Sequence, residues 1–153
     1  MNVRTIARQQ YQRIADRAAP HAALQTPPEG WLRTVRKALG MSGAQLGKKM
    51  GLTRARIAQA EQAELHGGVT LKSMQAAAEA LGCRFVYAIV PQHRIEDIIM
   101  GQARKKAKAI VGTASKHMAL ESQTLPKNKI AKEVDRLAQD MAREMPSDLW
   151  SDK

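Results

Sequence analysis

Apolar residues recur every three or four positions over most of this chain, which is the spacing that places them on one face of a helix. Segments rich in Gly, Pro and Thr interrupt this pattern. In order, it predicts a helix over 3–18, a linker over 20–30, four short helices within 31–82, and two longer helices over 94–118 and 127–145. The sequence LPKNK is expected to interrupt the helical pattern between the last two helices.

Capping residues mark the boundaries of the short helices. Ser42, Thr53 and Thr70 each precede an apolar run, and hydroxyl side chains are good N-caps. Gly51 stands where the chain turns, and a residue without a Cβ atom tolerates left-handed backbone there. Residues 42–61, SGAQLGKKMGLTRARIAQAE, therefore form two short helices joined by a tight turn, which is the shape of a helix-turn-helix.

One segment departs from the helical period. FVYAIV, residues 85–90, is short and rich in β-branched and aromatic residues, and Pro91 ends it, so it is predicted to be a strand. A single strand cannot satisfy its own backbone hydrogen-bonding groups. It needs a partner, either in a second copy of the chain or in a short piece of the 20–30 linker.

The predicted fold is mainly α-helical: a helix-turn-helix bundle with one short β-strand and long flanking N- and C-terminal helices. Residues 1–30 are expected to form the N-terminal helix and linker, residues 31–91 the DNA-binding domain with its strand, and residues 92–153 a helical extension. The apolar faces in this extension either complete the core or a homodimer, or they dock a partner protein. Its basic QARKKAK sequence either contacts flanking phosphate or is simply solvated.

Charge points to a polyanionic partner. The chain has 25 Lys+Arg against 14 Asp+Glu, a formal net charge of +11 and a pI of about 10.2. Residues 31–90 hold nine basic and three acidic residues, so more than half of the excess lies with the motif. Few aromatic side chains argue against a single-strand binder, which needs stacking platforms. No signal peptide and no apolar run of roughly 20 residues is apparent, which predicts a cytoplasmic protein. No membrane role is expected, because acidic Glu96, Asp97, Glu133 and Asp135 share the helices over 94–118 and 127–145.

The sequence offers no site for catalysis or for a metal, and it predicts neither an enzyme nor a cofactor. Its histidines are scattered: His21, His66, His93 and His117. Cys83 is the single cysteine, for which a small buried hydrophobic role is expected. Glu61 and Glu64 resemble paired carboxylates on one helical face, but structural or ion-pair roles are expected for them. The HGGV loop lacks the lysine of a phosphate-binding loop.

The second helix of the motif carries the candidate base-reading side chains. Arginine forms a bidentate pair with guanine and glutamine with adenine, and each good pair contributes about 1–3 kcal/mol of discrimination. Hydroxyls and helix N-termini can meet phosphates, which position the protein without specifying sequence. The predicted DNA-binding residues are Ser42, Gln45, Thr53, Arg54, Ala55, Arg56 and Gln59.

Residues 31–82 resemble the phage-repressor (Cro/repressor) helix-turn-helix family. The matching residues are Ser42, the Leu46–Gly47 pair, Gly51, Thr53, Ile57 and Glu61, followed by Leu71 and the Ala80-Leu81-Gly82 ending. The resemblance implies that Arg54, Ala55 and Gln59 face the bases, with Arg56 nearby. Two residues depart from the family. Many members have a glutamine in place of Gly43, which braces the reader and touches phosphate, and alanine is usual in place of Gly47.

The whole chain, including the ending MALESQTLP…LAQDM…PSDLW, resembles the family called mobile mystery protein A. These small helix-turn-helix proteins are typically encoded beside a Fic-domain partner, mobile mystery protein B, in an arrangement that resembles a toxin–antitoxin pair. Many small inhibitors of Fic enzymes carry the motif (S/T)xxxE(G/N). Glu29-Gly30 is the only candidate, and Gln25 stands where the motif needs Ser or Thr. A Fic partner would therefore be restrained by another contact, or only through transcription.

These observations predict a dimeric, sequence-specific repressor that binds an inverted repeat in double-stranded DNA. The resemblance implies that it regulates its own toxin–antitoxin-like operon as the antitoxin of a Fic-domain toxin. Two alternatives stay open. One is an inhibitor module that neutralises the Fic partner by direct binding, and the other is a stand-alone repressor of a phage or mobile element.

Overall fold

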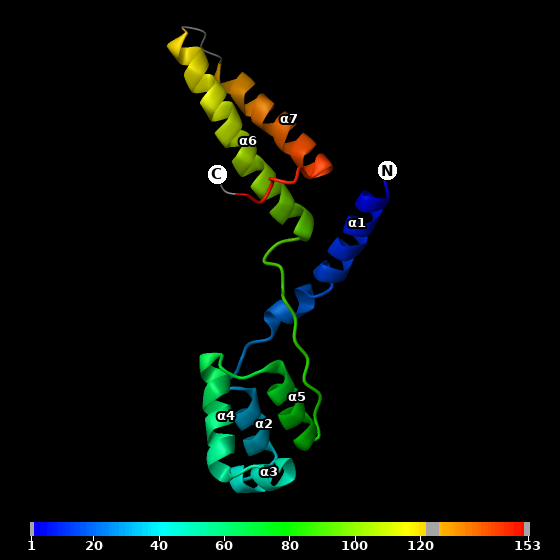
Figure 1. The fold of residues 1–153 in the computed structure, drawn as a ribbon, viewed down its shortest axis with the longest axis vertical. Coiled ribbons are helices and arrows are strands. Elements are labelled where there is room, and N and C mark those ends of the chain that lie inside the picture. Colours follow the sequence, from blue (N-terminus) through cyan, green and yellow to red (C-terminus); the bar gives the residue numbers. More distant parts are fainter. Residues whose placement is uncertain (1, 122–125, 152–153) are drawn as a thin grey trace. The chain divides into compact units, whose positions relative to one another are not determined.

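The computed structural model describes residues 2–121 and 126–151 as a helical chain (Figure 1). Its elements are α1 (Val3–Asp16), the 3₁₀ helix η1 (Ala19–Ala23), α2 (Trp31–Ala38), α3 (Gly43–Met50), α4 (Arg54–His66), α5 (Leu71–Ala80), α6 (Ile95–Leu120) and α7 (Lys127–Glu144). The chain divides into two compact units. Residues 20–89 form the central unit, and residues 1–19 together with 90–153 form the terminal unit.

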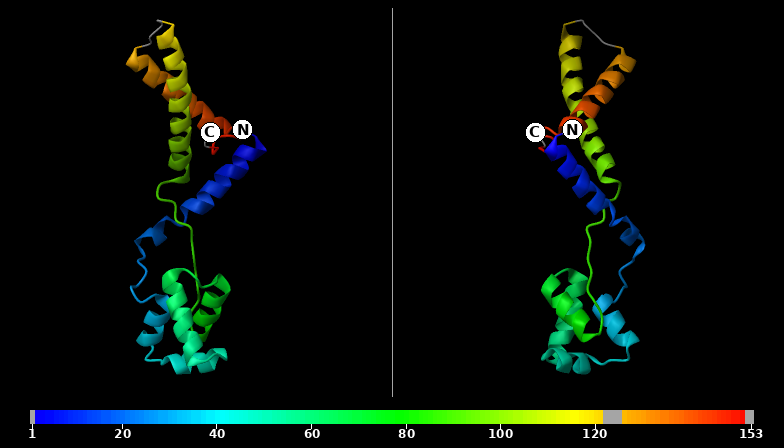
Figure 2. Two further views of the ribbon diagram at one scale, coloured as in Figure 1. Left: turned by 60° about the vertical axis from the view of Figure 1, so that its left-hand side comes forward. Right: turned by 90° about the vertical axis from the view of Figure 1, so that its right-hand side faces the viewer.

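The central unit is a bundle of four short helices, with α3 running across one end of the other three (Figures 1 and 2). Each helix contributes one apolar face to a common core. The buried members of that core are Leu32, Leu46, Ile57, Met74, Ala77 and Leu81. Trp31, Leu39 and Leu71 are exposed, because these helices are short and each buries only a narrow stripe.

The predicted caps of the short helices are confirmed. Ser42 and Gln45 form a capping box, in which Ser42 Oγ accepts from the Gln45 amide (3.1 Å) and Gln45 Oε1 accepts from the Ser42 amide (2.8 Å). Thr53 Oγ1 accepts from the Arg56 amide at 3.1 Å, and Thr70 Oγ1 from the Ser73 amide at 3.0 Å. These hydrogen bonds fix where α3, α4 and α5 begin.

The prediction of a short β-strand over residues 85–90 is wrong, because no strand occurs in the described parts of the chain. Strand formation requires a ladder partner, and no described segment pairs with these residues; part of the 20–30 linker is taken up by η1. Phe85 instead packs against the core of the central unit, and its ring stacks on Tyr87 with centroids 6.0 Å apart. Cys83 is exposed rather than buried, since it lies beyond the end of α5.

The terminal unit is built on α6 and α7, which lie side by side (Figures 1 and 2). Its core consists of Ile99, Ala103, Ala107, Val111, Val134, Ala138 and Leu149. Ala103, Ala107 and Ala138 are fully buried, and such small side chains let the two helix backbones approach closely. The predicted break at LPKNK begins at Leu125, which lies outside the described residues.

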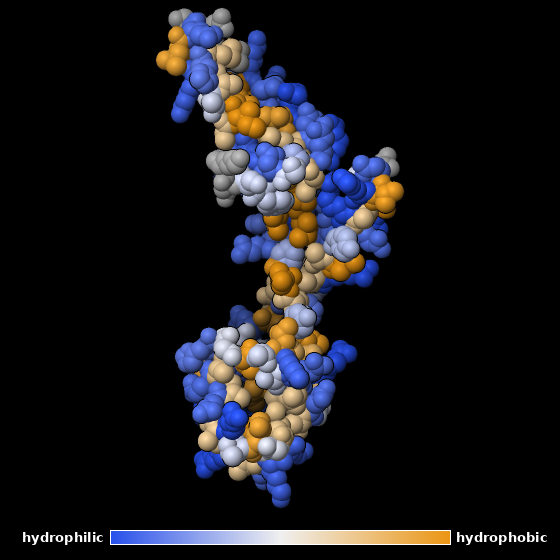
Figure 3. Space-filling view, viewed as in Figure 1, coloured by the Kyte–Doolittle hydropathy of each residue, from blue (hydrophilic) through white to orange (hydrophobic). Residues whose placement is uncertain are grey.

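The N-terminal helix α1 belongs to the terminal unit. Asp16 accepts a hydrogen bond from the backbone amide of Ile95 (3.0 Å) and so satisfies a free N–H group at the start of α6. The apolar face of α1 stays exposed, with Val3, Ile6 and Ile14 all more than half accessible. Figure 3 shows hydrophobic surface among hydrophilic side chains along α1. The division into segments 1–30, 31–91 and 92–153 stays a prediction.

None of the helices in the described residues has both the length and the hydropathy needed to cross a bilayer. Within the same residues, no group of three or more His, Cys, Asp or Glu side chains is placed to hold a metal ion.

Candidate DNA-binding surface

The helix-turn-helix is formed by α3, a turn at Gly51 and α4. Gly51 adopts left-handed backbone (φ 69°), which ends α3 and redirects the chain. Leu46 and Ile57 are almost fully buried and hold the two helices on the core. As a result, the outer face of α4 points away from the bundle and is available to a ligand.

The four residues expected to read bases lie on the first turns of α4. Arg54, Ala55, Arg56 and Gln59 are all exposed, and the structure brings them together on one short stretch of helix. Ala58, on the same helix, is also exposed. The base-facing roles assigned to these side chains stay a prediction.

The other three predicted DNA-binding residues lie at helix N-termini. Ser42 is the N-cap of α3, Gln45 lies in the first turn of α3, and Thr53 is the N-cap of α4. Their capping hydrogen bonds use one acceptor oxygen of each side chain. The Gln45 amide nitrogen, a donor, is not part of the box. The exposed ends of α3 and α4 therefore combine a partial positive charge with side-chain donors.

A polar hollow of about 520 Å³ opens in front of the N-terminus of α3. We define it by the residues of α2, the α2–α3 loop, α3 and α4 that line it: Arg33, Arg36, Ser42, Gly43, Ala44, Arg54, Ile57, Ala58 and Glu61. Three of these are arginines and one is a carboxylate. The hollow is therefore electropositive.

Gly43 makes room for an arginine in the polar hollow. A Cβ atom built on Gly43 would meet only Arg54 Cγ at 3.7 Å and Ile57 Cγ2 at 3.9 Å. The aliphatic stem of Arg54 thus lies over the first turn of α3, in the space that a longer side chain on residue 43 would share. Where many family members have a glutamine, this chain therefore has Gly43, and the stem of Arg54 occupies the space beside it.

Arg36 and Glu61 form the ion pair that joins α2 to α4. Arg36 Nε lies 2.5 Å from Glu61 Oε1 and Nη2 lies 3.1 Å from Oε2, while Nη1 donates to the backbone oxygen of Met41 at 2.9 Å. Both side chains are nearly buried, at 13% and 10% exposed. The hydrogen bonds that Arg36 donates to the Glu61 carboxylate raise the pKa of Arg36 above its ordinary value. The pair is a fixed structural contact behind the reading face.

Glu64 caps the N-terminus of α2. Its carboxylate accepts from the backbone amides of Trp31 (2.7 Å) and Leu32 (2.9 Å). Gly30, the N-cap residue, has no side chain to do this. Glu61 and Glu64, which resembled a catalytic pair in the sequence, are therefore both occupied in packing α4 against α2.

Sequence reasoning missed Arg33 and Arg36, although both line the polar hollow. Arg33 Nε is shielded from solvent and makes no hydrogen bond within the described residues. Its nearest carboxylate, Glu29, lies 4.0 Å away, beyond hydrogen-bonding distance. No spacing rule connects α2 to α3 across a loop, so only the folded arrangement reveals these side chains as part of the surface.

The cations of the motif are free of carboxylates. Among residues 2–121 and 126–151, none of Lys48, Lys49, Arg54 and Arg56 forms an ion pair. By contrast, in the terminal unit Arg104 pairs with Asp135 at 3.5 Å and Arg143 pairs with Asp140 at 2.8 Å. The uncompensated charge on α3 and α4 is the footprint expected of a nucleic-acid binder.

Comparison with known proteins agrees with this geometry. Residues 32–87 match the family model described as helix-turn-helix, a range that covers nearly all of α2, all of α3 to α5, and part of the extended segment after α5. No curated protein matches the chain. No solved structure matches it either. Residues 32–87 therefore form a Cro/C1-type helix-turn-helix domain, the domain of a family of DNA-binding transcription regulators.

Proposed function

We propose that this protein is a transcriptional repressor that reads double-stranded DNA by placing α4 in the major groove. The observation that carries the proposal is the group of exposed side chains without carboxylate partners on the first turns of α4. Arg54 and Arg56 each offer two parallel donors to guanine, and Gln59 offers a donor and an acceptor to adenine. Ala55 is small and apolar, which suits contact with a thymine methyl group.

Phosphate contacts are proposed around the polar hollow. The N-termini of α3 and α4, with Ser42, Gln45 and Thr53, present backbone donors to the DNA strand. Arg33 lines the hollow with a side chain that is 41% exposed, and its guanidinium would donate to a phosphate oxygen there. Such contacts fix the register of α4 without specifying bases.

A homodimer that reads an inverted repeat follows from the small size of this reader. One helix contacts only a few base pairs, and dimers of this type place two recognition helices about 34–36 Å apart. Exposed Ile110 and Leu120 on α6 offer apolar surface for a second copy. The proposed operator is therefore a two-fold symmetric site.

Binding to a library of DNA duplexes, followed by sequencing of the retained molecules, tests the reader. The intact protein is expected to enrich an inverted repeat. Arg54→Ala and Gln59→Ala should each lose preference at one or two bases of every half-site, by about 5–150-fold. Gln75→Ala, an exposed change on α5, is the control and should change nothing. A doubly substituted Arg54→Ala, Gln59→Ala protein that keeps the same preference would show that α4 does not read the bases.

We further propose that the repressed operon encodes a toxin with a Fic domain, with this protein as its antitoxin. The support is the resemblance of the whole chain to mobile mystery protein A, together with the uncovered apolar face of α1. A direct inhibitor is the second candidate, since that face could dock the toxin. The inhibitor motif is incomplete at Glu29, because Gln25 stands where the motif needs Ser or Thr, so the proposed inhibition does not use Glu29.

Co-purification with the neighbouring gene product separates these two roles. Direct inhibition predicts a complex that Ile6→Glu, on the exposed face of α1, disrupts while operator binding is retained. Lys116→Gln, an exposed change on α6, is the control and should leave the complex intact. If the intact protein forms no complex, direct inhibition is ruled out and transcriptional repression is the only remaining role. A neighbouring gene without a Fic domain would remove the antitoxin assignment.

A further inference from the structure

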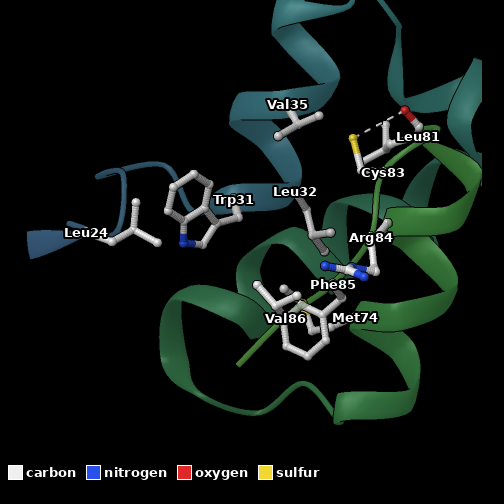
Figure 4. A pocket seen from close by; sticks show the side chains of 11 residues that line it. Leu24, Trp31, Leu32, Val35, Met74, Leu81, Cys83, Arg84, Phe85 and Val86 are labelled. Atoms are coloured by element: carbon white, nitrogen blue, oxygen red, sulfur yellow. Dashed lines mark hydrogen bonds between the residues drawn. The ribbon is translucent and has the colours of Figure 1, made fainter. Parts of the chain in front are cut away.

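An apolar hollow of about 240 Å³ lies in the central unit. It is bounded by α2, α5 and residues 83–86 of the extended segment, with one side chain from the 20–30 linker (Figure 4). Figure 4 shows Leu24 and Trp31 on one side, Val35 above, and Met74 and Phe85 at the opposite end. None of these residues belongs to the proposed DNA-reading surface, so the hollow is a separate feature.

The size of the hollow limits what it can accept. An apolar cavity of about 150 Å³ is sufficient for benzene. A volume of 240 Å³ therefore admits one aromatic ring or a short alkyl chain, with room for a small polar group. Apolar walls with a single polar anchor are typical of small-molecule sites.

Arg84 is the one charged residue among those that line the hollow. No carboxylate lines it, and in the described parts of the chain Arg84 forms no ion pair. The other polar side chain, Cys83, directs its thiol to the backbone oxygen of Leu81 at 3.5 Å, the dashed line in Figure 4. The unmatched group is thus a cation beside apolar surface, and its complement is an anion attached to an apolar body.

The wall that carries Arg84 adds further donors. The backbone amides of Arg84, Phe85 and Val86 make no backbone hydrogen bonds to other described residues. Successive N–H groups of extended backbone point to opposite sides, so the amides of Arg84 and Val86 lie on one side and that of Phe85 on the other. The guanidinium is the principal donor, since charge-assisted hydrogen bonds are the strong ones. A carboxylate fits this set of donors.

We propose that the apolar hollow binds a small aromatic or short-chain aliphatic carboxylate. The apolar body lies against Trp31, Val35 and Phe85, and the carboxylate is bound by the Arg84 guanidinium. This site is independent of the DNA-reading surface, so the two assignments stand or fall separately.

NMR titration of the full-length protein tests the proposal, with the Trp31 indole N–H signal as the probe. A Trp150→Phe background leaves Trp31 as the sole tryptophan. Phenylacetate and hexanoate are the test ligands, and 2-phenylethanol and 1-hexanol are their neutral counterparts. The carboxylates are expected to saturate the Trp31 shift at concentrations on the order of millimolar and to bind about tenfold more tightly than the alcohols.

Two variants locate the carboxylate. Arg84→Gln is expected to remove the preference over the alcohols while leaving the fold intact, since Arg84 is exposed. Leu24→Asp places a negative charge at the rim and should abolish carboxylate binding; Leu24 is also exposed. Lys108→Gln, an exposed change in the terminal unit, lowers the net charge equally and should bind like the parent protein.

Three results would overturn the proposal: no saturable shift of Trp31, equal binding of alcohol and carboxylate, or an unchanged preference in Arg84→Gln. A Trp31 shift that follows protein concentration rather than ligand would show that a second copy covers the hollow, which also overturns it. Operator binding is measured in parallel on the same proteins, so loss of that activity is not confused with loss of this site.

Discussion

The backbone oxygen of Leu52 lies 2.6 Å from the position that a Cβ atom on Gly47 would take. The Leu52 amide also donates to the Gly47 carbonyl at 2.7 Å, and this hydrogen bond holds the two backbones close together. The turn between α3 and α4 packs directly on the backbone of α3. Glycine at position 47 is what allows this close approach, even though alanine is usual in the family that the motif resembles.

Gly47→Ala is therefore expected to destabilise the central unit. The inserted methyl group must displace backbone, which costs about 1–3 kcal/mol, and the better helix propensity of alanine offsets up to about 1 kcal/mol of that. We expect a net loss of about 1–2 kcal/mol. Urea unfolding followed by Trp31 fluorescence in the Trp150→Phe background measures it, because Trp31 lies in the central unit.

Gly101→Ala is the matched control for this substitution. Gly101 also lies inside a helix, α6, but a Cβ atom there would meet nothing within 4 Å. Its replacement should stabilise the terminal unit by about 0.5–1 kcal/mol through helix propensity alone. Unfolding followed by Trp150 fluorescence in a Trp31→Phe background reports on this unit. Two alanine variants that shift stability in the same direction would mean that the contact with Leu52 is not what requires Gly47.

Helices and caps were predictable here because they depend on neighbours in sequence. Ser42, Thr53 and Thr70 cap the helices they precede, as local chemistry dictates. The strand over 85–90 was mispredicted because strand formation, unlike a helix or a cap, depends on residues that are distant in sequence. Its β-branched and aromatic residues favour extended backbone, but a strand also needs a distant ladder partner, and local composition does not report whether one exists.

The Arg36–Glu61 pair should be costly to break from one side only. Arg36→Met leaves a nearly buried carboxylate without its partner and removes the donor to Met41, for an expected loss of about 3 kcal/mol. Glu61→Leu should have a similar effect, because it leaves the nearly buried guanidinium without its carboxylate and with only the Met41 carbonyl as an acceptor. Urea unfolding of the central unit measures both changes.

The double variant Arg36→Met, Glu61→Leu completes the cycle for this pair. Replacing both charges by apolar groups removes the unpaired ion, so the double variant should recover at least about 1 kcal/mol relative to the sum of the single losses. Purely additive losses would indicate that the two side chains stabilise the fold separately.

Glu64→Ala should loosen the start of α2. The substitution removes the acceptor of two backbone amides at a helix N-terminus, which corresponds to about 1–2 kcal/mol of stability. Gln62→Ala, an exposed change on the same helix, is the control and should stay within about 0.5 kcal/mol of the parent protein. Hydrogen exchange at the Trp31 and Leu32 amides localises the effect: faster exchange is expected at these two positions, and an unchanged rate would rule out the capping role.

The candidate site was predictable only in part. Arg54, Arg56 and Gln59 follow the cap Thr53 in a readable pattern, and their exposure on α4 is as expected. The polar hollow could not be predicted from the sequence, because it is lined by residues of α2, α3 and α4 that only the fold brings together. Pairings such as Arg36 with Glu61 cross 25 positions and leave no periodic signal in the sequence.

Arg33→Gln tests whether the polar hollow faces phosphate rather than bases. The loss of a single phosphate contact should weaken binding to the operator and to unrelated duplexes by a similar factor. It should also lower the slope of log K against log salt by about one. Arg54→Ala should instead change base preference. Lys108→Gln carries the same change in net charge in the terminal unit and is expected to leave the slope unchanged. Fluorescence anisotropy with an operator duplex at several salt concentrations measures all three, and a parent-like salt slope in Arg33→Gln would place Arg33 away from the DNA backbone.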